Sequence, residues 1–190
     1  IGFCLQDAEI ASHALYGRHG LTFQLANSIL TDGFWYEGTA AYHFYALTAL
    51  YRTVEVARFA GIDFWDNQAF RSMFRAPVSY VFPDLTFPAV NDSDVFSLGG
   101  RHWLYDAAYA RTRDPVFLIV ANENENRSSE ALLYGTESLP PPPQMALESQ
   151  VFSGLGAAVL RQGAGADQLY VHLDYGPHGG GHGHLDKLAV

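Results

Sequence analysis

Up to a run of four prolines at residues 140–143, apolar residues recur every three to four positions, the spacing of one face of an α-helix. This pattern predicts helices over residues 7–16, 21–30, 39–60, 66–80, 97–112 and 115–122, with a loop over 83–94. Pro77 could break the fourth of them. The longest places His43, Leu47, Leu50 and Val54 on one face. Antiparallel helix pairs joined by short loops are therefore expected.

The hydrophobic period changes beyond the prolines. Four consecutive prolines cannot continue a helix and favour an extended chain, which predicts a linker over residues 140–147. After it, alternation with a period of two predicts strands over 149–154, 157–161 and 168–174, with a turn at 163–167. The sequence thus predicts an α+β chain with a helical domain over 1–139 and the beginning of an antiparallel sheet domain over 148–190.

Composition narrows the function classes. Of the 190 residues 48% are apolar, enough for a well-buried core, and the net charge of −9 argues against general binding of nucleic acid or anionic membranes. No run approaches the roughly twenty apolar residues of a membrane span. The single cysteine, Cys4, cannot form an internal disulfide, so cysteine content does not distinguish an oxidising from a reducing compartment for this protein. The start has no basic signal-peptide region, and we expect the chain to be a segment cut at both ends.

A glycine–histidine stretch at residues 174–187, with five glycines and three histidines in fourteen positions, calls for an explanation beyond folding. In an extended segment, His182 and His184 point to the same side, which suits metal ligation or a shared polar site. With Asp186 they could be ligands of a metal-dependent hydrolase. Two histidines do not close a zinc site, however, and a lone histidine is more often structural.

A second cluster opens the longest helix, where Tyr36, Glu37, Tyr42 and His43 could line a cleft. The positive end of the helix would favour an anionic ligand there. The alternative is structural, with Glu37 as a helix-terminal charge and Tyr45 in the core.

Farther along the chain, Arg101, His102 and Trp103 could contact a sugar, the cation pairing with a carboxylate and the aromatic ring stacking on the pyranose. Burial of Trp103 in the helical core is the competing interpretation.

Two motifs together resemble the heparinase II/III superfamily of polysaccharide lyases, which includes oligoalginate lyases. One is Asp-Gly-Phe-Trp-Tyr-Glu-Gly-(three residues)-Tyr-His-Phe-Tyr-Ala-Leu at 32–47, and the other runs from Ser153-Gly154 through the glycine–histidine stretch to Leu188. The resemblance implies a partial (α/α) toroid followed by a β-sandwich, with a cleft between them. It also implies β-elimination on a uronic-acid-containing polysaccharide.

The resemblance assigns roles residue by residue. Tyr42 matches the catalytic tyrosine that can protonate the departing O4, and His182 matches the histidine that neutralises the uronate carboxylate. His184 matches a ligand of a structural zinc. The expected substrate-binding residues are Glu37, His178, Tyr36, His43 and Arg101.

Further expectations concern the positions at which this sequence departs from the family pattern, the substrate and the location. No Asn-His pair precedes Tyr42, and the remaining zinc ligands would fall beyond Val190, so the isolated chain is expected to be inactive and to bind zinc poorly. Only 11 Lys and Arg residues favour an unsulfated uronate such as alginate over heparin or heparan-type chains. The resemblance implies a periplasmic or secreted location, with the cytoplasm and a homodimer left open. A non-catalytic uronate-binding module is the second alternative, beside the metal-dependent hydrolase.

Overall fold

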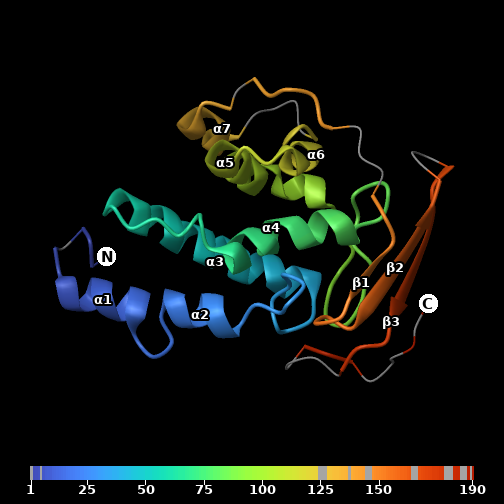
Figure 1. Ribbon diagram of the computed structural model, residues 1–190, viewed down its shortest axis with the longest axis horizontal. Coiled ribbons are helices and arrows are strands. Elements are labelled where there is room, and N and C mark those ends of the chain that lie inside the picture. The colour runs from blue at the N-terminus through green and yellow to red at the C-terminus, as the bar shows by residue number, and fades with distance from the viewer. Residues whose placement is uncertain are drawn as a thin grey trace.

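The computed structural model describes residues 2–4, 6–123, 128–136, 138–143, 147–163, 167–177, 182–184, 188 and 190. Its helices are α1 (Ala8–Tyr16), α2 (Leu21–Asn27), α3 (Ala40–Phe59), α4 (Gln68–Tyr80), α5 (His102–Thr112), α6 (Leu118–Ala121) and α7 (Ser129–Tyr134). Two 3-10 turns, η1 (Leu98–Arg101) and η2 (Pro115–Phe117), precede α5 and α6. Figure 1 shows α1 at one end of the molecule and the sheet at the other.

The sheet consists of β1 (Gln150–Phe152), β2 (Ala157–Gln162) and β3 (Leu169–Asp174), antiparallel in that order. Phe152 pairs with Ala157, and Ala157 pairs in turn with Asp174. The inward side chains Phe152, Ala157 and Val159 are buried, whereas Val151 and Leu160 on the alternate positions are exposed. The period of two seen in the sequence therefore corresponds to one covered and one open face.

The predicted helices and strands are largely confirmed, with differences at the ends. α2 ends at Asn27, short of the expected residue 30, and the segment expected over 97–112 begins as the 3-10 turn η1. The prediction missed α7. Ser128 is its N-cap, and the side chain of Ser128 accepts a hydrogen bond from the backbone N of Ala131. Gly135, in the left-handed region, follows its last turn.

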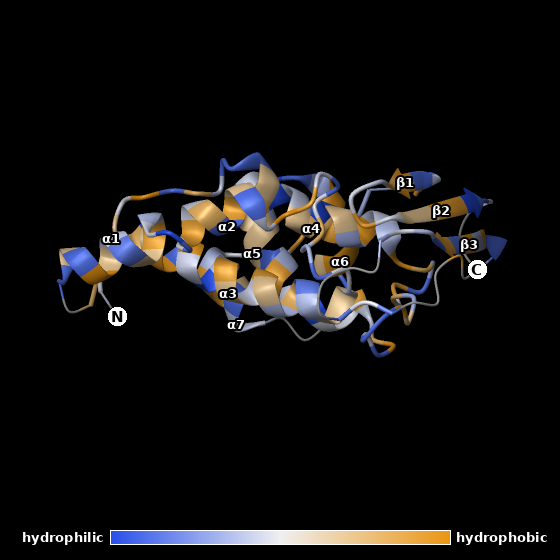
Figure 2. Cartoon of the chain, turned by 90° about the horizontal axis from the view of Figure 1, so that it is seen from below, coloured by the Kyte–Doolittle hydropathy of each residue, from blue (hydrophilic) through white to orange (hydrophobic). Residues whose placement is uncertain are grey.

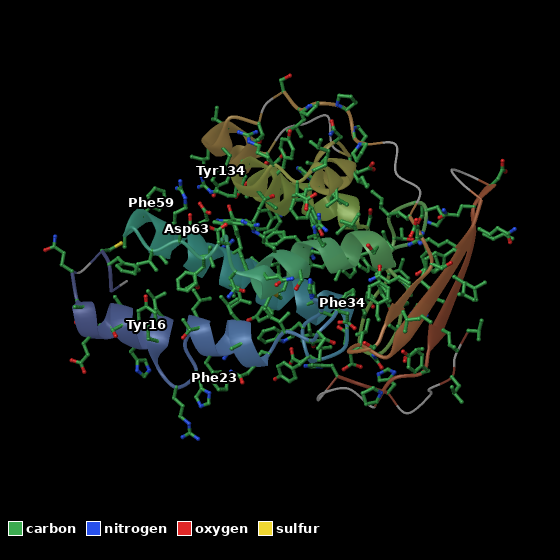
Figure 3. All side chains as sticks on the ribbon, viewed as in Figure 1. Tyr16, Phe23, Phe34, Phe59, Asp63 and Tyr134 are labelled. Atoms are coloured by element: carbon green, nitrogen blue, oxygen red, sulfur yellow. The ribbon has the colours of Figure 1, made fainter. Side chains whose placement is uncertain are left out.

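The helices meet the sheet through an aromatic cluster. The ring of Phe34 lies 5.1 Å from that of Tyr80 and 5.7 Å from that of Phe152, all three being buried. Asp32 Oδ2 accepts a hydrogen bond of 2.7 Å from the backbone of Leu155 in the β1–β2 turn. Figure 3 labels Phe34, which lies where the helices face the sheet. The cluster packs the sheet against the motif at residues 32–47.

Gly156 brings the glycine–histidine stretch close to this junction. Its φ is +79°, and a Cβ there would collide with the backbone of Gly176. The backbone N of Tyr175 donates to Gly156 O at 2.8 Å. A side chain at Gly156 would therefore displace the chain after β3 from the β1–β2 turn against which it lies.

The predicted fourth helix is confirmed as α4, and the proline within it causes no break. Pro77 has no N–H, so the carbonyl of Met73, four residues earlier, receives no helical hydrogen bond from it. The Met73 carbonyl instead accepts from His43 Nε2 at 2.9 Å. α4 continues to Tyr80 because a side chain from α3 supplies the missing donor.

The same contacts correct the expectation that His43 contacts substrate. His43 is fully buried, and its Nδ1 accepts from the backbone N of Trp35 at 3.1 Å. Burial lowers the pKa of His43 to about 4, against the raising effect of the hydrogen bond to Met73. His43 is thus a neutral core histidine whose two nitrogens fasten α3 to α4 and to the chain before α3.

We expect His43→Gln to reduce the loss of stability on mild acidification. The folded pKa of His43 lies below its unfolded value, so protonation favours the unfolded chain as the pH falls from about 6.5 towards 4. Over this window the wild type should lose about 3 kcal/mol through His43. Urea unfolding at pH 7 and pH 4.5 measures the loss, with His13→Gln on the exposed surface of α1 as the control. An equal loss in the wild type and His43→Gln would contradict the assignment.

The helices are amphipathic or largely buried, and Figure 2 shows hydrophobic and hydrophilic residues interleaved along them. Among the described residues, no helix combines the length and apolar character needed to cross a membrane. The domain boundary predicted at 140–147 stays a prediction. Buried residues before and after it belong to one hydrophobic cluster.

Candidate functional site

Three segments that are distant in sequence meet at the start of α3: the helix itself, the loop around residues 91–92 and residues 182–184. Thr39 caps α3 and accepts from the backbone N of Tyr42 at 3.2 Å, which places Tyr42 in the first helical turn. Gly38, with φ +76°, turns the chain into the cap, and its carbonyl accepts from Asn91 Nδ2 at 2.9 Å. The loop is thereby attached directly beside Tyr42.

Tyr42 and His182 lie face to face. Their ring centroids are 3.6 Å apart and the ring planes differ by 16°. The two side chains expected to be catalytic are therefore in contact, although they come from the helical part and from the segment after β3. A substrate group placed at the edge of this stack would meet a phenol and an imidazole together.

The imidazole of His182 lies between two carboxylates. Its Nδ1 is 3.2 Å from Asp92 Oδ2, and its Nε2 is 3.9 Å from Glu37 Oε1. Hydrogen bonds from His184 and from His182 lower the pKa of Asp92, so Asp92 is an anion at neutral pH. A carboxylate only accepts hydrogen bonds, so His182 Nδ1 carries the hydrogen in its bond to Asp92. Asp92 therefore fixes the orientation of the ring, and Nε2 faces Glu37.

Asp92 also holds His184, and Asn91 supports it. Asp92 Oδ1 lies 2.6 Å from His184 Nε2, and Asn91 Oδ1 accepts from the backbone N of His184 at 3.0 Å. The backbone N of Asp92 donates to the carbonyl of His182 at 3.2 Å. Asn91 and Asp92 thus grip both histidines through side chain and backbone.

The sequence interpretation missed Asn91 and Asp92. The available signal was the polar run Asn91-Asp92-Ser93-Asp94 within a predicted loop. Asn91 adopts φ +54°, a conformation that asparagine tolerates better than most residues. The run reads equally well as a solvated turn, so its role appears only when the chain is folded.

The described residues do not form a zinc site. In the described ranges no three His, Cys, Asp or Glu side chains are grouped so that they could hold a metal ion. His184 Nε2 is hydrogen-bonded to Asp92, and a closed zinc site needs four ligands. We therefore derive no chemical step through a metal, and the structural zinc at His184 stays a prediction.

The other predicted substrate contacts fall into different surroundings. Glu37 accepts from Trp35 Nε1 at 2.9 Å, which holds its carboxylate beside His182. Tyr36 is half exposed, and its ring lies 5.2 Å from that of Trp35. The guanidinium of Arg101 lies over the rings of Phe44 and Phe96. His178, like Asp186 of the alternative metal site, lies outside the described residues.

Two alternatives from the sequence are also decided. Trp103 packs against the core, with its ring 5.8 Å from that of Tyr51, as the structural interpretation expected. Tyr45 is 80% exposed, which contradicts its assignment to the core.

Comparisons with known proteins agree with the resemblance. A family model described as heparinase II/III N-terminus matches residues 9–102. Two solved structures of heparan sulfate lyase HepC from Pedobacter heparinus, one of them a mutant, are similar with a TM-score of 0.59 and 20% identity. Each match covers 88% of this chain and 25% of the solved chain. No curated protein matches the sequence.

These findings settle the fold. The expectation of a helical toroid segment followed by the beginning of an antiparallel sandwich is confirmed. The chain spans about a quarter of the length of the solved structures that it matches.

Proposed function

The chain belongs to the heparinase II/III superfamily through residues 9–102, and from that premise we propose that it carries part of the active site of a polysaccharide lyase. The proposed substrate is a uronic-acid-containing polysaccharide or oligosaccharide. The proposed reaction is β-elimination, with Tyr42 as the general acid and His182 neutralising the uronate carboxylate. The observation that carries the proposal is the stack of Tyr42 on His182, held in place by Asp92.

In β-elimination a base removes the proton from C5 of the uronate, the C5 electron pair forms the C4–C5 double bond, and the C4–O4 bond breaks. The departing O4 takes a proton. Negative charge builds on the uronate carboxylate as the C5 proton leaves, so a donor positioned there lowers the barrier. A phenol beside O4 can supply the leaving-group proton, and a phenolate on the same face could first take the C5 proton.

The geometry supports this division of roles. His182 Nδ1 donates to Asp92, so the ring is fixed through one nitrogen and its other edge faces Glu37. The contact between the two rings brings the phenol of Tyr42 close to the imidazole of His182. One uronate could therefore meet the carboxylate-binding group and the acid at once, as elimination requires.

The choice of uronate polymer belongs to the proposal. The low content of Lys and Arg, 11 in the chain, supports an unsulfated substrate such as alginate. The similar solved structures are heparan sulfate lyases, but at 20% identity they support the fold alone. A periplasmic or secreted location rests on the family resemblance.

Product analysis on the full-length natural polypeptide tests the function. Incubation with alginate or heparan sulfate should give chain ends that absorb in the ultraviolet because of the new double bond. Products that are saturated and formed only with added metal would point to the hydrolase. Binding without any cleavage would point to the non-catalytic module.

We expect Asp92→Asn to lower kcat about ten- to a hundredfold with a much smaller change in KM. The amide keeps the size of Asp92 but loses the charge-assisted hydrogen bonds to His182 and His184, which fix the orientation of both rings. Initial rates of double-bond formation give both constants. Asp94→Asn, an exposed change two residues away, is the matched control. Equal rates for Asp92→Asn and the wild type would show that Asp92 does not position the histidines.

A further inference from the structure

A hollow of about 420 Å³ lies beside the first half of α3 and is not used by the proposed chemistry. Tyr45, Thr48 and Arg52 of α3 line it together with Arg101 of η1. The exposed ring of Tyr45 offers an aromatic surface, and the Thr48 hydroxyl already donates to Phe44 O at 2.7 Å, which leaves its oxygen able to accept. The hollow thus combines two cations, an aromatic face and a hydroxyl.

The two guanidinium groups are poised for an anion. Arg101 is half-buried, and its guanidinium is held 5.8 Å from the ring centre of Phe44 and 5.6 Å from that of Phe96. In the described part of the chain neither Arg52 nor Arg101 forms an ion pair, whereas Arg111 is paired with the buried Glu55. Two arginines facing one hollow without a carboxylate are notable in a chain of net charge −9.

The hollow and the candidate site are neighbours along α3. The hollow begins at Ala41, next to Tyr42, and Tyr45 lies one helical turn after Tyr42 on the same side of α3. Arg52 is ten positions beyond Tyr42, about 15 Å along the helix axis. Phe96, which supports Arg101, belongs to the same loop as Asp92. A linear sugar chain held at Tyr42 could therefore continue along α3 into the hollow.

The charges around Tyr42 explain why such a continuation would be needed. Glu37 and Asp92 flank His182, so an acidic polymer approaching the site meets two carboxylates. Repulsion between these carboxylates and the anionic groups of the polymer disfavours binding at this point. Cations a few turns away can supply the binding energy without disturbing the His182–Asp92 bond, whose orientation matters for the reaction.

We propose that the hollow bounded by Arg52, Arg101 and Tyr45 is a subsite that binds the carboxylate or sulfate of a sugar near the one at Tyr42. This inference rests on the proposed function, since it extends the same substrate along α3. The shared chemistry is an anionic oxygen group accepting from guanidinium N–H donors, with the sugar ring against Tyr45. A uronate carboxylate and a sulfate ester are the two sources of that group.

Binding of two defined ligands tests the subsite. Affinities for an alginate tetrasaccharide and for a heparan sulfate tetrasaccharide are measured calorimetrically, in the Tyr42→Phe protein so that neither is consumed. Arg52→Gln and Arg101→Gln should each weaken binding about tenfold, the loss of one charge-assisted hydrogen bond. The salt dependence of the affinity should become shallower. Arg58→Gln, which removes an equal charge from the far end of α3, is the control and should leave affinity unchanged.

Arg101→Lys covers the case in which Arg101→Gln fails to fold, because it keeps a cation near Phe44 and Phe96. It should bind with an affinity between those of the wild type and Arg52→Gln. Loss for both ligands identifies the carboxylate, which both carry, as the bound group, and loss confined to the heparan ligand identifies the sulfate. The subsite is overturned if a double variant, Arg52→Gln with either Arg101→Gln or Arg101→Lys, binds both ligands as tightly as the protein that keeps both arginines. It is also overturned if the protein that keeps both arginines binds neither ligand.

Turnover separates this inference from the proposed function. Unsaturated product that forms equally well in the arginine variants and in the wild type, at low substrate concentration, would sink the subsite and leave the lyase standing. Arginine-dependent binding without unsaturated product in any form of the protein would do the reverse.

Discussion

Tyr42→Phe should lower the rate of double-bond formation by about 10²–10⁴-fold, the usual contribution of a positioned general acid. The substitution removes only the hydroxyl, and the phenyl ring can still stack on His182 at the 3.6 Å observed for the tyrosine. Affinity for the sugar chain should therefore change little. The loss arises because O4 would leave without a proton donor beside it.

Rates are followed by ultraviolet absorbance of the product with the full-length natural polypeptide. Tyr16→Phe is the matched control, because it deletes an exposed hydroxyl on α1, at the end of the molecule opposite the sheet. A Tyr42→Phe protein that retains more than a tenth of the wild-type rate would refute the role of Tyr42 as the acid.

The second large effect concerns stability and arises at Glu55 on α3. Glu55 is 7% exposed and receives four hydrogen bonds: from Arg111 at 3.1 and 2.6 Å, from Trp65 at 2.6 Å and from Tyr134 at 2.8 Å. Burial works to raise its pKa, but these bonds hold the pKa below its usual range. The Tyr134 hydroxyl also contacts that of Tyr51 at 2.8 Å. One carboxylate thus joins α3, α5 and α7, and Tyr134 is labelled on α7 in Figure 3.

We expect Glu55→Ala to lower the free energy of unfolding by about 3–5 kcal/mol, because it leaves Arg111 partly buried without its counter-ion. Chemical denaturation at neutral pH measures the change. Glu9→Ala in the exposed first turn of α1 is the control and should cost well under 1 kcal/mol. Glu55→Gln combined with Arg111→Met should recover part of the loss, since no unpaired charge remains.

Acid should weaken the same network. The folded pKa of Glu55 is depressed, so its contribution is complete above the pKa of the unfolded chain and is lost as the pH falls through the folded pKa. Glu55→Ala with wild-type stability at neutral pH would show that the buried pair does not fasten these helices.

The hydrophobic period predicted most of the elements, because α3 and the three strands bury one regular face each. The same reasoning left the effect of Pro77 open, since local propensity does not reveal that His43 supplies a donor to the Met73 carbonyl from another helix. It also placed His43 in the cleft, because a histidine beside Tyr42 resembles a substrate-binding residue and the sequence does not show that it is buried. Both points concern the same long-range contact, the hydrogen bond between His43 on α3 and the Met73 carbonyl on α4.

The candidate site was predictable where a residue type is unusual in its setting. Glycines around His182 and His184 and a tyrosine at a helix start are such signals, and the fold brings Tyr42 onto His182. Asn91 and Asp92 carry no such signal, because short polar residues in a loop are ordinary. Their role depends on two segments about ninety residues apart in sequence meeting in space.

The central claim is that Tyr42 and His182 act as one unit on one uronate, and a double-mutant cycle tests it most directly. Rates of unsaturated-product formation are compared for the wild type, Tyr42→Phe, His182→Ala and the double variant. Groups that act together lose their effect together, so the double variant should be little slower than the slower single variant. Two effects that multiply in the double variant, or single variants as fast as the wild type, would contradict the claim.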